Sequence, residues 1–245
     1  LITAQPAHSL LKVMPVEPHF TLNRKNTFYT SQLPRDAIEY TLKTINFSPV
    51  IDNVTLIKGE IKSMLCERNL YSISIDDEKD LLTRANAFLQ DLNRTIYIGF
   101  DLDPAVADLK GTHFYFDFNL PYKHKLYELL HYTTWSINGK QIAVKTGLAG
   151  ERMPGKKTGG IFAHYNMLNL NDEKIMDLYR NQFLHIDDSV RMKTIEKQPF
   201  PAELLAYFPD RVNELDPQYW LKIVFPPYFK KEDLEDLYVH LNSFP

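Results

Sequence analysis

Short runs of alternating apolar and polar residues recur along the chain, and a period of two predicts strands buried on one face. The run His19–Leu22 follows Pro15 and Pro18, which disfavour a helix, so we predict a strand over residues 19–23. In this strand Phe20 faces one side, while His19 and Thr21 face the other. Similar patterns predict strands at residues 2–5, 54–57, 70–75, 95–100, 113–118, 141–146, 189–196 and 219–227.

Apolar residues at helical spacing predict helices between these strands. A helix over residues 35–43 follows Pro34, which suits a helix start. Asp76 and Asp77 are placed to cap a helix over residues 78–92 and to supply an acidic first turn. Further helical segments are predicted at residues 8–14, 123–131, 172–184 and 231–241.

Composition limits the class of protein. The 245 residues are 44% hydrophobic and 13% aromatic, which is enough for a packed core. The net charge of −3 supplies no global field that attracts nucleic acid, so a polyanion site would have to be local. A single cysteine, Cys66, excludes an intramolecular disulfide framework and a multi-cysteine metal cage. No apolar run approaches the roughly 20 residues that span a bilayer, and no signal-peptide pattern opens the chain, so we expect a cytoplasmic protein.

Two of the predicted strands carry a histidine followed two residues later by a hydroxyl. These pairs are His19 with Thr21 and His113 with Tyr115, and in each strand both side chains project from one face. Near neutral pH one imidazole can be neutral and act as a base while another is charged and acts as an acid. The hydroxyls can donate hydrogen bonds to charged oxygens. The pattern predicts proton-transfer chemistry with no metal and no cofactor.

The segment Val16–Leu22, together with the second histidine motif, resembles the two-histidine phosphoesterase superfamily. This superfamily includes bacterial RNA-ligase-like proteins and plant and fungal cyclic phosphodiesterases, which carry two H-x-[T/S] motifs facing each other across a groove. The spacing of 94 residues between His19 and His113 is similar to that of the family. The predicted strand at 70–75 and helix at 78–92 resemble the family's link between two lobes.

The resemblance covers roughly residues 15–150 and implies an α+β fold. Two small antiparallel sheets are expected to flank a central groove, with helices on the outside. We expect a single domain over residues 1–245, in which residues 151–245 form a C-terminal elaboration packed on a two-lobed core of residues 1–150. The implied activity is metal-independent hydrolysis of a 2′,3′-cyclic phosphate or a 2′-5′ linkage in RNA or a nucleotide.

The chain departs from the family at two points. Tyr115 stands where the family has Thr or Ser, and its longer side chain would move the phosphate away from His113. The strand and helix that open the family fold have little room before His19, and residues 219–241 resemble them instead. A competing second motif is His131-Tyr132-Thr133, which keeps the threonine but follows a helical pattern.

A basic loop and a rival function complete the predictions. Arg152, Lys156 and Lys157 lie in a glycine-rich segment and are expected to contact phosphates of a longer RNA. The rival is a non-catalytic binding or host-interaction protein that merely shares the alternation of strands and helices. The arrangement of the two imidazoles discriminates between these functions, because catalysis requires that both face one groove.

Overall fold

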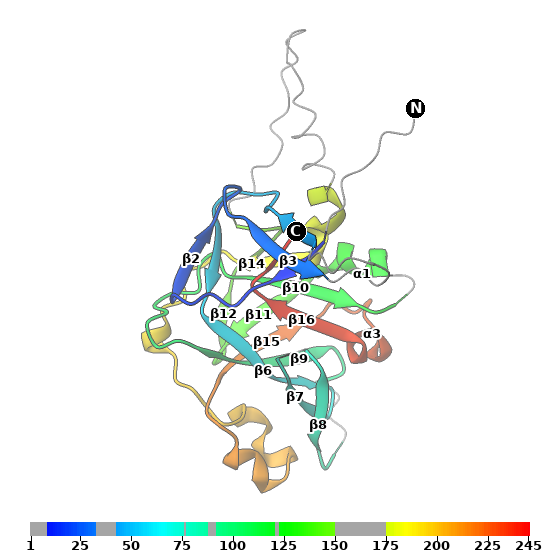
Figure 1. Cartoon of the computed structure of the whole chain (residues 1–245). Coiled ribbons are helices and arrows are strands. Elements are labelled where there is room, and N and C mark those ends of the chain that lie inside the picture. Colours follow the sequence, from blue (N-terminus) through cyan, green and yellow to red (C-terminus); the bar gives the residue numbers. More distant parts are fainter. Residues whose placement is uncertain (1–8, 33–42, 76, 88–91, 121–122, 150–174) are drawn as a thin grey trace.

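A computed structural model describes residues 9–32, 43–75, 77–87, 92–120, 123–149 and 175–245 of the chain (Figure 1). Its largest element is an antiparallel sheet of seven strands. In spatial order these strands are β12 (Lys140–Ile142), β11 (Thr134–Ile137), β15 (Tyr219–Val224), β9 (Thr95–Leu102), β6 (Gly59–Cys66), β7 (Asn69–Ile73) and β8 (Lys79–Arg84).

A second antiparallel sheet has four strands. Their order is β13 (Val144–Thr146), β14 (Phe183–Ile186), β10 (His113–Phe118) and β16 (Leu237–Leu241). Three two-stranded pairs complete the strands in the described residues: β1 (Leu11–Lys12) with β17 (Ser243–Phe244), β2 (His19–Leu22) with β5 (Val54–Ile57), and β3 (Phe28–Gln32) with β4 (Lys43–Phe47).

The main hydrophobic core lies between the two larger sheets. In β10 the alternating residues Phe114, Phe116 and Phe118 enter this core, where they meet Trp135 of β11 and Ile98 of β9. The opposite face of β10 is also covered, because Tyr115 belongs to a separate buried cluster with Leu22, Phe183 and Phe244. Burial on both faces explains why this strand is rich in aromatic residues.

The helices of the described residues are short. The α-helices are α1 (Lys123–Leu129) and α3 (Lys231–Glu235), and residues 175–179 are also helical. The 3₁₀ turns are η2 (Leu130–Tyr132), η3 (Arg180–Gln182), η4 (Met192–Thr194), η5 (Ala202–Tyr207) and η6 (Asp210–Glu214). None of the helices in this part of the chain is long and apolar enough to cross a membrane.

The predicted α+β fold is therefore wrong. The fold consists mainly of sheet, with one seven-stranded and one four-stranded sheet where two small sheets flanked by outer helices were predicted. Strands from beyond residue 150 are integral to both larger sheets, since β15 lies between β11 and β9, and β10 lies between β14 and β16. Neither larger sheet has a boundary at residue 150.

The predicted helix over 78–92 is wrong at residues 79–84, which form the edge strand β8, while residues 88–91 lie outside the described residues. Asp77 does not cap a helix but occupies a turn between β7 and β8, with a φ of 61°. Its carboxylate accepts hydrogen bonds from Lys12 Nζ at 2.6 Å and His240 Nδ1 at 3.0 Å. Burial by itself would raise the pKa of Asp77, but these hydrogen bonds outweigh it and lower the pKa. These tertiary contacts thus stabilise the β7–β8 hairpin more than local helical spacing stabilises a helix here.

Other predicted elements differ in part. The predicted helix over 231–241 ends at Glu235 and continues as strand β16, and the strand over 141–146 is divided into β12 and β13. Residues 192–194 form a 3₁₀ turn where a strand was predicted. Leu11–Lys12 form a strand inside the segment expected to be helical at 8–14. The strand predicted at 2–5 lies outside the described residues, as does nearly all of the helix predicted at 35–43.

The outer face of the seven-stranded sheet is only partly covered. Apolar residues between 200 and 212, including Phe200 and Phe208, pack on Tyr97 of β9 and Trp220 of β15. The apolar residues between 200 and 212 lie in and beside the turns η5 and η6, which are drawn in orange in Figure 1. Beyond Trp220, toward β11 and β12, the same face of the sheet carries exposed polar residues. This uncovered part of the sheet is the floor of the cavity described below.

Candidate functional site

The first predicted motif lies on the short strand β2. His19 and Thr21 are both exposed, while Leu22 is buried. The strand pairs with β5, so that His19 is opposite Ile57 and Thr21 is opposite Thr55. The predicted strand and the shared face of the two polar side chains are confirmed, because the alternation in the sequence determines both.

The second predicted motif is inside the protein. His113 is 1% exposed, and its Nε2 lies 2.7 Å from the backbone oxygen of Ser243, to which it donates in the neutral form. Burial lowers the pKa of His113 to about 4. Tyr115 is also buried, with its ring between those of Phe183 and His240, and burial raises the pKa of its phenol. Both side chains contribute to packing in this structure.

The two motifs do not meet across a groove in this arrangement. Leu22 of β2 packs in the same buried cluster as Tyr115. Because neighbouring side chains of a strand alternate in direction, Thr21 and His19 project away from that cluster. An exposed imidazole and a buried one therefore lie on opposite sides of the β2–β5 pair.

The competing motif is divided between the surface and the core. His131 is exposed, whereas Thr133 is buried. The Thr133 hydroxyl donates to the backbone oxygen of Leu130 at 2.7 Å and accepts from Trp135 Nε1 at 2.9 Å. This hydroxyl is therefore the hydrogen-bond acceptor for the buried indole N–H of Trp135. The three residues of the basic loop, Arg152, Lys156 and Lys157, lie outside the described residues.

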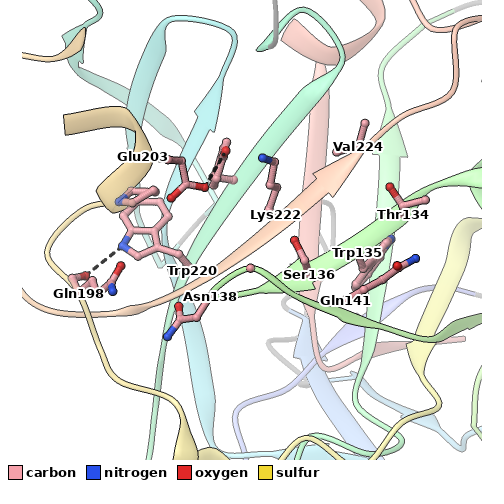
Figure 2. Close-up of a pocket in the computed structure, with 13 residues that line it drawn as sticks. Thr134, Trp135, Ser136, Asn138, Gln141, Gln198, Glu203, Trp220, Lys222 and Val224 are labelled. Carbon is pink, nitrogen blue, oxygen red and sulfur yellow. Dashed lines mark hydrogen bonds between the residues drawn. The ribbon is translucent and has the colours of Figure 1, made fainter. Parts of the chain in front are cut away.

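A cavity of about 400 Å³ lies on the outer face of the seven-stranded sheet (Figure 2). Its floor is a row of directly opposed residues on four neighbouring strands, which we call the polar row. Gln141 of β12 is opposite Ser136 of β11, Ser136 is opposite Lys222 of β15, and Lys222 is opposite Tyr97 of β9. Because directly opposed residues share a face, all four side chains project toward the cavity.

Further polar residues surround the polar row. Thr134 lies on the same face of β11, Asn138 lies in the turn after it, and Gln198 and Glu203 come from the segment that covers the rest of the sheet. Trp220 closes one side of the cavity, and its Nε1 donates to the backbone oxygen of Gln198 at 3.0 Å. Neutral hydrogen-bonding groups therefore lie on several sides of the cavity.

The two charged groups of the cavity lie near Tyr97. The Tyr97 hydroxyl donates to Glu203 Oε1 at 3.1 Å, and Lys222 Nζ lies 5.4 Å from the centroid of the Tyr97 ring. The hydrogen bond orients the carboxylate, and the aromatic ring attracts the ammonium group. The cavity consequently presents one cationic and one anionic group beside its amides and hydroxyls.

The sequence predictions did not identify this cavity, and none of the predicted site residues within the described part of the chain lines it. One signal could have located its edge. Asn138-Gly139 is a strong sequence signal for a two-residue hairpin turn, and both residues have positive φ, 47° and 76°, in the turn between β11 and β12. The polar row itself depends on pairing between strands that are distant in the sequence.

Comparison with protein-family models, curated proteins and solved structures found no match to this chain. Among the described residues, no group of three or more histidine, cysteine, aspartate or glutamate side chains is arranged to hold a metal ion.

Proposed function

We propose that this protein is a non-catalytic binding protein that holds a carbohydrate in the cavity on its seven-stranded sheet. The polar row Gln141–Ser136–Lys222–Tyr97 is the observation that carries the proposal. Amide and hydroxyl groups both donate and accept hydrogen bonds, as sugar hydroxyls do. The volume of about 400 Å³ lies within the range of about 300–1,000 Å³ that is typical of small-molecule sites.

The position of these side chains on neighbouring strands also favours recognition of a ligand. Strands hold the backbone of the polar row at the regular spacing of about 4.8 Å between neighbours, so the backbone needs little ordering when a ligand binds. The buried residues Trp135, Leu221 and Ile223 alternate with them and anchor the same strands in the core. The cytosol is the proposed location, as composition predicts.

A binding experiment with a matched pair of variants tests the proposal. Ser136→Leu would fill the centre of the polar row with an apolar side chain and should abolish binding. Saturation-transfer difference NMR with a panel of methyl glycosides measures it. Thr21→Leu, at an exposed position on β2, is the control and should leave the signals unchanged. If no glycoside gives a signal with the unmodified protein, or if both variants behave alike, the carbohydrate proposal is wrong.

Phosphodiester hydrolysis is the second candidate, and one observation favours it. His19 and Thr21 are exposed side by side, so one imidazole and one hydroxyl can reach a phosphate. The resemblance to two-histidine phosphoesterases supplies the rest of this proposal. A second proton-transfer group would have to become accessible, because His113 is buried.

Hydrolysis of a 2′,3′-cyclic nucleotide tests the second candidate. We expect no turnover above the rate without protein, since binding is the preferred function. If turnover is observed, His19→Ala should reduce it at least tenfold, because general acid–base groups typically contribute more than this. Parallel His113→Gln and His131→Ala variants would then identify the second histidine. Turnover that survives in all three variants would reject the two-histidine mechanism.

A further inference from the structure

The cavity contains a cation with a free side for a ligand. Lys222 projects from β15 onto the cavity floor, and in the described part of the chain no carboxylate forms an ion pair with it. By contrast, Lys12, Lys58 and Lys145 each pair with an aspartate at 2.6–2.9 Å. An ammonium group in a concave site attracts an anion more strongly than one on an open surface.

Hydrogen-bond donors lie on the side of Lys222 that faces away from Tyr97. Ser136 is directly opposite Lys222, and Gln141 is directly opposite Ser136, so an ammonium, a hydroxyl and an amide follow one another across the sheet. Figure 2 shows Lys222 and Ser136 projecting side by side from neighbouring strands. Opposed Cβ atoms lie about 5 Å apart, so the two oxygens of one carboxylate can reach both groups.

The charges favour a single negative charge on the ligand. One ammonium group balances one carboxylate, whereas a phosphate monoester carries nearly two negative charges at neutral pH. The Glu203 carboxylate, held by Tyr97, lies in the same cavity and would repel the second charge. Its remaining acceptor capacity suits a ligand hydroxyl.

We infer that the cavity takes an acidic sugar, whose carboxylate binds Lys222 and Ser136 and whose hydroxyls bind the amides and Glu203. This inference rests on the carbohydrate-binding function proposed above and specifies its ligand class. Besides Tyr97, five neutral side chains with amide or hydroxyl groups line the cavity: Thr134, Ser136, Asn138, Gln141 and Gln198. They favour a hydroxylated carboxylate over a free amino acid, which would use only the two charged groups.

Two ligands that differ only at one carbon provide the test. Methyl β-D-glucuronoside and methyl β-D-glucoside carry a carboxylate and a hydroxymethyl group, respectively, at that position. The glucuronoside should bind at least tenfold more tightly in NMR titrations, because hydrogen bonds to charged groups are about twice as strong as neutral ones. Raising the salt concentration should weaken its binding and leave that of the glucoside nearly unchanged.

Two variants test whether the preference for the glucuronoside depends on the ammonium group of Lys222. Lys222→Gln should remove the preference for the glucuronoside and retain glucoside binding, whereas Lys140→Gln, at an exposed lysine of β12, should retain both. Equal binding of the two ligands, or a preference that survives Lys222→Gln, would overturn the acidic-sugar inference but leave carbohydrate binding intact. Tighter binding of inorganic phosphate or of L-glutamine would also overturn it. Failure of both glycosides would instead reject the proposed function.

Discussion

Replacing Trp135 with alanine should lower the free energy of unfolding by about 3–5 kcal/mol, as truncation of a buried aromatic residue typically does. Trp135 is 1% exposed and packs edge-on against Phe114 and Phe116, with ring centroids 5.4 and 6.0 Å away. Its indole also donates to the Thr133 hydroxyl. Alanine would therefore leave a large cavity between the two sheets and remove the hydrogen bond that the Thr133 hydroxyl accepts.

Urea unfolding followed by circular dichroism measures this loss. Trp135→Phe retains most of the apolar volume and should cost about 1–2 kcal/mol, from the lost hydrogen bond and imperfect packing. Tyr132→Ala removes an aromatic ring that is exposed three positions earlier in the chain, and should change stability by less than about 0.5 kcal/mol. A Trp135→Ala protein as stable as the Tyr132→Ala protein would contradict the core described here.

Acidification below pH 6.5 should destabilise the protein through His113. The folded pKa of this histidine is about 4, below its ordinary value of 6.5, so the unfolded chain binds the proton more tightly. The contribution of neutral His113 is complete above pH 6.5, declines as the pH falls toward 4, and changes little further below 4. The difference of about 2.5 between the unfolded and folded pKa values of His113 corresponds to a loss on the order of 3 kcal/mol in the free energy of unfolding.

Urea unfolding at a series of pH values between 7 and 4 measures this effect. His113→Gln offers an amide donor to the Ser243 oxygen without a titrating group, and it should flatten the dependence between pH 6.5 and 4. His131→Gln, at an exposed histidine, should retain the dependence of the unmodified protein. Parallel curves for His113→Gln and the unmodified protein would show that His113 does not titrate in this range.

These two positions also indicate how the fold relates to the cavity. Trp135 anchors β11 in the core, and its neighbours Thr134 and Ser136 consequently face outward into the cavity. His113 is anchored to the C-terminal strand through Ser243. A residue predicted as a proton donor or acceptor is thus used for packing, while residues outside the predicted motifs form the candidate site.

Local patterns in the sequence specify several strands and the side-chain directions within them. The alternation His113–Phe118 predicted β10 with its observed bounds, and the alternation at 19–23 predicted that His19 and Thr21 share a face. Period-two patterns in aromatic and β-branched residues are locally encoded, so neighbouring residues are sufficient to specify them. The helix predicted at 123–131 is observed as α1 followed by a 3₁₀ turn, because helical spacing of apolar residues is also encoded locally.

Long-range packing sets which strand faces are exposed and which strands are neighbours. Alternation placed His113 and Tyr115 on one face of β10, but that face is covered by a second buried cluster, which the local pattern cannot reveal. Residues 79–84 have near-helical spacing yet pair with β7, since hydrogen bonding to a sheet and contacts at the Asp77 turn outweigh weak local propensity. The polar row needs β15 between β11 and β9, and such non-local pairing follows from burial of the whole core rather than from any one segment.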